Sequence, residues 1–305
     1  MKLFSHLCPN DYPFLIPQSF FNVFEGENIA ISENPYLLSS LGLAIPSLKN
    51  RVLFSLNDPL PHSFILKTFH SSKVVEACDP SPRGDAQYLV TNVENIAEVF
   101  HEKKYLAIKT ADCLPVVFCF RKSNVFAGAV CHAGWRGFSA QILQSTVELL
   151  IQKVALFNIN RFEFLASLQM FIGPAIFGVS YECGLDVQKA LSQHRDVTFS
   201  NYHCEDKLYK SLFDCCSDLT KDSSLLPYLL NQKRKIEVAD NVKVYPDLQL
   251  LAALEAVVIG LNQKNISILR ENTYGHPTLF SFRQATHRDI PKVTHQWTHL
   301  CFIDD

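Results

Sequence analysis

A cysteine and a histidine stand at the two ends of one short apolar stretch in the middle of this chain. Cys113 lies in the segment 110–115, and His132 begins the segment 132–137. Thiolate sulfur and imidazole nitrogen are zinc ligands, and a third protein ligand would leave one position open for substrate. The same pair could instead be a thiol nucleophile and its base, or a core cysteine and a hydrogen-bonded histidine. The two residues alone leave all three interpretations open.

The residues between Cys113 and His132 predict that the two side chains meet. Two apolar runs rich in β-branched residues, 114–120 and 125–130, flank the polar break 121–124. This pattern is typical of two adjacent strands of a hairpin. Because Cys113 enters the first strand and His132 leaves the second, an antiparallel pairing places both at the same end of the sheet.

A glycine-bracketed turn follows His132. Gly134 and Gly137 enclose Arg136, and apolar residues then recur at helical spacing over 138–154. A strand that enters a helix through such a turn leaves unpaired backbone N–H groups beside His132, and these can hold a phosphate. Arg136 would add a planar, bidentate charge, so it is our first candidate for phosphate binding.

Both segments resemble signature motifs of a known family. Thr-Ala-Asp-Cys-Leu-Pro at 110–115 and His-Ala-Gly-Trp-Arg-Gly at 132–137 are similar to those of the multicopper polyphenol oxidase (laccase) domain family. Its members are also called peptidoglycan-editing factors and are regarded as zinc-dependent purine nucleoside phosphorylases. Both motifs are long and specific.

The resemblance continues on both sides and covers about residues 25–290. Upstream, Phe-His-Ser at 69–71 and the stretch 84–91 are similar to the family's histidine motif and the segment after it. Downstream, 172–176 resembles its Ile-Gly-Pro loop, and 280–283 resembles its Phe-Ser-Tyr-Arg segment.

The resemblance implies a zinc site made by His70, Cys113 and His132, with copper as a metal that can bind in vitro. It also implies phosphorolysis of adenosine, inosine and methylthioadenosine, with deamination of adenosine as a side activity. Purine nucleosides and inorganic phosphate would then be the partners.

Further site residues follow from their positions. Asp112 precedes a proposed ligand, so it is a candidate acid or base of the reaction. An equally weighted alternative is that Asp112 supports the metal ligands through hydrogen bonds. Arg51 and Arg283 are weaker candidates for phosphate binding than Arg136.

The chain departs from the family pattern at three places. It has Thr68 where the family usually has glutamine, Asn272 before Thr273 where a Cys-Thr pair is common, and Gln284 in place of the second arginine of a doublet. These departures leave open a metal-binding protein with weakened or lost catalysis. The runner-up hypothesis is a metal-free cysteine hydrolase with Cys113 as nucleophile and His132 as base.

Composition sets broader limits. The 305 residues carry 28 basic and 30 acidic side chains, so no basic surface for nucleic acid is indicated. Neither an export signal nor a membrane-length apolar run stands out, and we expect a cytoplasmic protein with reduced cysteines. No His-x-His motif occurs to support a multicopper oxidase site. His295 and His299, four apart, could share one face of a helix. The sequence does not indicate the oligomeric state.

The wider pattern predicts an α+β fold. Short strand-like runs at 105–109, 168–172 and 266–269 alternate with helix-like ones, of which 248–261 is the clearest. Mixed strands and helices favour layers, and the resemblance implies a single-domain α/β/β/α sandwich with mixed sheets over residues 1–305. We expect a peripheral insertion within 194–240.

Overall fold

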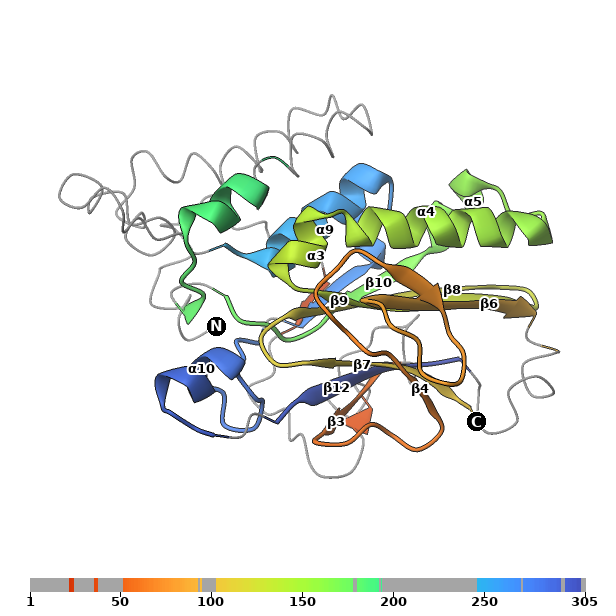
Figure 1. Cartoon of the computed structure of the whole chain (residues 1–305). Coiled ribbons are helices and arrows are strands. Elements are labelled where there is room, and N and C mark those ends of the chain that lie inside the picture. The colour runs from red at the N-terminus through yellow and green to blue at the C-terminus, as the bar shows by residue number, and fades with distance from the viewer. Residues whose placement is uncertain are drawn as a thin grey trace.

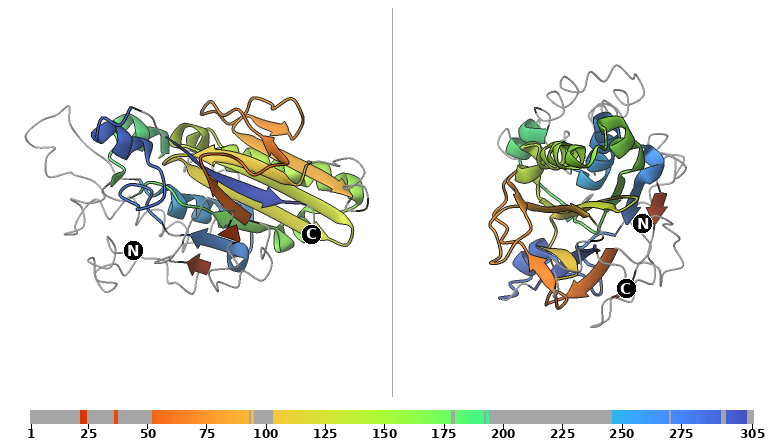
Figure 2. Two further views of the ribbon diagram at one scale, coloured as in Figure 1. Left: turned by 90° about the horizontal axis from the view of Figure 1, so that it is seen from below. Right: turned by 90° about the vertical axis from the view of Figure 1, so that its right-hand side faces the viewer.

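Two sheets stacked face to face organise the protein (Figures 1 and 2). The structure is a computed structural model, and it describes residues 22–24, 36–37, 52–92, 94, 103–177, 180–191, 193, 246–269, 271–291 and 294–302.

The larger sheet has seven strands in the order β1-β11-β10-β8-β9-β6-β5. In this order the strands are β1 Asn22–Phe24, β11 Ile266–Leu269, β10 Gln169–Ile172, β8 Leu114–Lys122, β9 Val125–Ala133, β6 Ala86–Asn92 and β5 Val74–Glu76. It is mixed, because β8 and β9 pair antiparallel whereas β10 and β11 pair parallel.

The smaller sheet has five strands in the order β2-β3-β12-β7-β4. Its strands are β2 Tyr36–Leu37, β3 Val52–Leu56, β12 Gln296–Cys301, β7 Tyr105–Thr110 and β4 Ser63–Ile65. The C-terminal strand β12 lies between β3 and β7 and pairs antiparallel with both.

Helices cover the outer face of the larger sheet (Figure 1). The helices with defined bounds are α3 Trp135–Ser139, α4 Ile142–Val154, α5 Arg161–Ser167, α9 Leu248–Ile259 and α10 Phe282–His287, and short 3-10 turns span Ala155–Phe157 and Gln263–Asn265. Whereas α4 and α9 pack on that sheet, α10 lies beyond one end of β12.

The strand β8 is buried on both faces. Val116 and Phe118 belong to the core under the helices, and Val117 and Cys119 belong to the core between the two sheets. A strand with two buried faces reads as a continuous apolar run, which explains the pattern at 114–120. Cys119 is a buried core residue, as is Cys131 on β9.

The fold confirms the predicted layered α+β class with mixed sheets. The predicted strands are present as β7, β10 and β11, and the predicted helix at 248–261 is α9. The expected insertion within 194–240 lies outside the described residues. Among those residues no single helix could span a membrane; the stretch Ile142–Phe157 and α5 meet the length and composition only as a pair, which is bent by 117°.

Candidate metal centre

The hairpin places Cys113 beside His132, as the sequence predicts. In the β8–β9 pairing, Leu114 lies opposite Ala133 and Pro115 lies opposite His132. Cys113 immediately precedes β8, so the thiol and the imidazole share one end of the larger sheet. The polar break is shorter than expected, because β8 extends through Lys122 and β9 begins at Val125.

A buried carboxylate, Asp85, lies against His132. Asp85 precedes β6, which pairs with β9, and its backbone carbonyl accepts a hydrogen bond from the His132 N–H at 2.7 Å. Its side-chain Oδ1 lies 2.8 Å from His132 Nδ1, and the side chain is fully buried. With Nδ1 as the donor, Nε2 of His132 is left for a ligand.

The same carboxylate holds the loop that carries His70. Asp85 Oδ1 accepts from the backbone N–H groups of Phe69 and His70 at 3.1 and 3.0 Å. Its Oδ2 accepts from the backbone N–H and the hydroxyl of Ser71 at 2.7 and 2.8 Å. His70 has a φ of 62°, so these bonds stabilise a left-handed conformation that most residues avoid.

His70, Cys113 and His132 form one compact group. Their candidate ligand atoms all lie within 4.8 Å of one another. The two imidazole rings meet edge to face, with centroids 4.8 Å apart. His132 is buried, Cys113 is half-buried and His70 is exposed, so the group faces outward on one side. Within the part of the chain that the structure describes, it is the sole group of three or more such residues that could hold a metal.

The donor set fits a metal ion. One sulfur and two imidazole nitrogens suit zinc and leave a fourth position open, as in catalytic rather than structural zinc sites. The Asp85–His132 bond supplies the outer support that metal-binding histidines usually have. The expected ligand set is therefore assembled in space, and its role as a ligand set stays a proposal.

Electrostatics couple the three side chains. Burial alone would raise the pKa of the Cys113 thiol, but the charge of His132 and hydrogen bonds from both imidazoles outweigh it and lower that pKa. Burial would lower the pKa of His132, yet Cys113 and Asp85 raise it above its usual value. Burial opposes ionisation of Asp85, but hydrogen bonds from His132 and Ser71 lower its pKa to about 2. A thiolate beside an imidazolium is thus the favoured state of the metal-free pair.

Two glycines of the turn allow it to pack closely against Cys113 and the loop that carries His70. A Cβ on Gly134 would lie 2.9 Å from Cys113 Sγ and 3.4 Å from His70 Cδ2. A Cβ on Gly137 would lie 2.5 Å from the backbone oxygen of Ser71. Both glycines are therefore required by close contacts rather than by an unusual backbone angle.

The helix after this turn differs from the expected one. It begins at Trp135, but it ends at Ser139, and a separate helix starts at Ile142 after Gln141, whose φ is 66°. A helix of five residues has little dipole, so the turn offers less to an anion than the sequence suggested.

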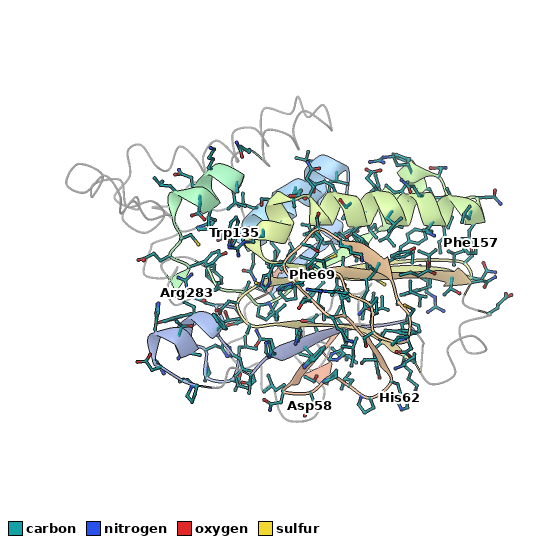
Figure 3. The ribbon with its side chains drawn as sticks, viewed as in Figure 1. Asp58, His62, Phe69, Trp135, Phe157 and Arg283 are labelled. Carbon is teal, nitrogen blue, oxygen red and sulfur yellow. The ribbon has the colours of Figure 1, made fainter. Side chains whose placement is uncertain are left out.

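A cavity of about 600 Å³ opens over the group. Its walls include Arg136, Arg283 and Asp112 besides the three candidate ligands. Trp135 and Arg283 lie at the same end of the molecule (Figure 3). The Arg136 guanidinium is exposed and stacks over the Trp135 ring at 4.4 Å.

Asp112 is tied to the C-terminal part of the chain. Its Oδ1 accepts from the Thr273 hydroxyl at 2.6 Å, and its Oδ2 accepts from the Arg283 backbone N–H at 2.7 Å. The Arg283 side chain donates to the carbonyl oxygen of Glu182 at 2.7 Å. With one strong donor on each oxygen, Asp112 has the contacts of a positioning residue, which was one of its two expected roles.

The three departures from the family pattern have different positions. Thr68 lines the cavity. Asn272 donates to the Ser180 hydroxyl and accepts from the Tyr274 N–H, and the side-chain oxygen of Gln284 accepts from the Gly275 N–H. Neither Asn272 nor Gln284 is among the cavity-lining residues. Arg51 lies outside the described residues.

The helix that could have joined His295 and His299 is absent from this part of the described chain. They do not share a helix face, because β12 begins at Gln296 and takes in His299, whose side chain is fully buried. His295 lines the cavity. Sequence reasoning missed the place of His295 and Asp85 at the site, since they reach it through pairings of strands distant in sequence, and it also missed Lys109, which lines the cavity from β7.

Comparison with known sequences agrees with this site. A family model described as multi-copper polyphenol oxidoreductase laccase matches residues 48–227, which include all three candidate ligands. A purine nucleoside phosphorylase from Haemophilus influenzae is 31% identical over 163 residues, or 52% of this chain and 58% of that protein. The match thus spans little more than half of that relative. A purine nucleoside phosphorylase from Rickettsia prowazekii is 24% identical over 229 residues, 74% of this chain and 72% of its own length.

Solved structures share the fold. A protein from Neisseria meningitidis has a TM-score of 0.52 at 20% identity, covering 82% of this chain and 93% of its own. YlmD from Geobacillus stearothermophilus has a TM-score of 0.52 at 18% identity, covering 81% and 75%. With the motifs, the assembled His/Cys/His group and the match to more than half of the sequence, the chain belongs to the multi-copper polyphenol oxidoreductase laccase family.

Proposed function

We propose that this protein is a purine nucleoside phosphorylase that uses a zinc ion held by His70, Cys113 and His132. The observation that carries the proposal is the compact His/Cys/His group beneath a cavity of about 600 Å³ with two arginines in its walls. Cavities of this size are typical of small-molecule sites. Relatives named purine nucleoside phosphorylases support the reaction class.

In phosphorolysis, a phosphate oxygen forms a bond to the anomeric carbon of the ribose while the bond from that carbon to the purine nitrogen breaks. The electron pair leaves with the base, which takes up a proton. Zinc would supply a Lewis acid when bound. Arg136 and Arg283 give the cavity the positive charge that a phosphate needs.

Aromatic side chains in the cavity suit the purine. Trp135 and Phe282 both line it, and Phe282 is 59% exposed. Stacking on an aromatic ring is tolerant of the base, because every base has a π-face. This fits a substrate range of adenosine, inosine and methylthioadenosine, and deamination of adenosine by water would be a separate side activity at the same metal.

The first experiment measures metal content and activity together. The purified protein and Cys113→Ala are analysed for zinc and copper, then assayed on the three nucleosides with and without phosphate. We expect about one zinc per chain, lost in the variant, and base release that requires phosphate. Cys78→Ala is the matched control, because Cys78 is an exposed thiol outside the site. Bound zinc without any nucleoside turnover would instead support a metal-binding protein that has lost catalysis.

A cysteine hydrolase is the second candidate, and one observation favours it. Asp85, His132 and Cys113 form a carboxylate–imidazole–thiol series, and the Cys113 pKa is lowered to about 6. This arrangement can activate a thiol nucleophile. Iodoacetamide treatment in excess chelator separates the candidates: a hydrolase keeps amide-cleaving activity in chelator and loses it on alkylation. A zinc enzyme has already lost its activity in chelator, and in a parallel sample without chelator its bound zinc protects Cys113 from the reagent.

A further inference from the structure

Lys109 enters the cavity from the smaller sheet. It lies near the end of β7, opposite Trp297 of β12, four residues before Cys113. The side chain is half-buried and lines the cavity. The cavity therefore has a cation on its β7 side besides the two arginines on the helical segments.

His295 lines the same cavity as Lys109 and the candidate ligands. It precedes β12. Burial lowers the pKa of His295, and the charges of Lys109 and His132 lower it further. His295, Lys109 and the candidate ligand His132 thus line one cavity.

The other two cations of the cavity have other contacts. Arg136 is exposed and stacks on Trp135, and the Arg283 guanidinium donates to the Glu182 carbonyl oxygen. In the described part of the chain, no carboxylate oxygen lies within ion-pair distance of the Lys109 ammonium. Asp112 is near Lys109 in sequence, but its two carboxylate oxygens accept hydrogen bonds from the Thr273 hydroxyl and the Arg283 N–H.

A half-buried ammonium without a counter-charge is unfavourable, and an anion in the cavity would relieve that cost. Lysine is a point charge that binds phosphate well. A neutral imidazole in the same cavity can donate one further hydrogen bond to a phosphate oxygen.

We propose that Lys109, assisted by His295, anchors the inorganic phosphate of the reaction. The phosphate then lies on the β7–β12 side of the cavity, facing His70, Cys113 and His132. The inference rests on the proposed phosphorylase function, and it makes Arg136 and Arg283 secondary to Lys109 for phosphate affinity.

The test uses the full-length, zinc-loaded protein and the variants Lys109→Met and Lys109→Arg. Methionine keeps an unbranched stem without the charge, and arginine restores the charge. Lys153→Met is the matched control, because Lys153 lies in the last turn of α4 and outside the cavity lining. Binding of inorganic phosphate is measured by calorimetry, and the KM values for phosphate and for inosine are measured separately. Zinc content and circular dichroism check that each variant is folded. If Lys109→Met does not fold, Lys109→Gln replaces it.

We expect Lys109→Met to weaken phosphate binding and to raise the phosphate KM by about 10- to 100-fold, as for loss of a charged hydrogen bond. The inosine KM should change by less than about threefold. Lys109→Arg should recover part of the loss, and Lys153→Met should match the wild type.

The outcomes separate the two proposals. If inosine is cleaved but Lys109→Met leaves the phosphate KM unchanged, the inference is wrong and the function stands. If phosphate binding depends on Lys109 but no nucleoside is cleaved, Lys109 is a phosphate-binding residue and the proposed function is wrong. A wild type that binds no phosphate overturns both. A parallel titration with adenosine 5′-monophosphate distinguishes a phosphate carried by the substrate: a Lys109 effect on that ligand alone overturns the inference.

Discussion

The Asp85 carboxylate lies 2.8 Å from Nδ1 of His132 while also accepting the backbone N–H groups of residues 69–71. One buried side chain thus orients one candidate ligand directly and a second, His70, through its backbone. Because the two ligands come from segments more than sixty residues apart, Asp85 is the residue that links them.

Asp85→Asn should reduce zinc affinity by about 10- to 100-fold, the usual effect of removing a partner of a metal-bound histidine. The NH2 group of the asparagine would lie against the backbone N–H donors of residues 69–71, where it cannot accept a hydrogen bond. Competition with a chromophoric zinc chelator gives the affinity, and Asp58→Asn, at an exposed carboxylate, is the control. Unchanged affinity would show that the His132 orientation does not depend on Asp85.

The two glycines of the turn should respond differently to alanine. Gly137→Ala should lower the free energy of unfolding by about 1–3 kcal/mol, because its Cβ would meet the Ser71 backbone oxygen, which cannot move alone. Gly134→Ala should mainly lower zinc affinity, because its Cβ would meet Cys113 Sγ.

Gly184→Ala is the control for both, since its Cβ would meet only the end of the Asp186 side chain. Denaturant unfolding and zinc titration on the same samples check both effects. Equal effects of Gly134→Ala and Gly137→Ala on both quantities would contradict the assignment.

Substitutions of Asp112 and Thr273 should have coupled effects on the free energy of unfolding. Asp112→Ala and Thr273→Val each remove the same hydrogen bond, so their effects on the free energy of unfolding should not be additive. The double variant should lose less than the sum by about 1 kcal/mol. If Asp112 is instead the acid or base of the reaction, Asp112→Asn alone will abolish turnover, and Thr273→Val will leave it nearly intact.

His299 should make the fold sensitive to acid. Its Nε2 accepts from the Leu60 N–H at 3.1 Å and its Nδ1 lies 3.3 Å from the Leu53 carbonyl oxygen. Only the neutral ring can accept at Nε2, and burial lowers its pKa from 6.5 to about 4. The folded pKa lies below the unfolded one, so the full stability is present above pH 6.5 and is lost as the pH falls toward 4.

The expected loss from this group is about 3 kcal/mol. His299→Gln does not titrate, so the difference in unfolding free energy between it and the wild type should shift by that amount between about pH 7 and about pH 4. Parallel pH curves of the two proteins would rule out a neutral, buried imidazole.

Local sequence was sufficient for the hairpin and for the positions of Cys113 and His132 at its ends. Two apolar runs around a polar break determine that Cys113 and His132 share one end of a sheet, because antiparallel pairing is decided by neighbours in sequence. The motif Phe-His-Ser at 69–71 indicated His70 as the third candidate ligand by resemblance, and the mixed layers followed from alternating strands and helices.

Only the tertiary structure decided what surrounds these ligands. Asp85 reaches His132 through the β6–β9 pairing, and the β7–β12 pairing brings Lys109 and His295 to the same cavity. The spacing of His295 and His299 fits a helix as well as a strand, and the position of β12 inside a sheet selected the strand. Such pairings join segments separated by up to about two hundred residues, and register between distant strands depends on burial across the whole core rather than on any local pattern.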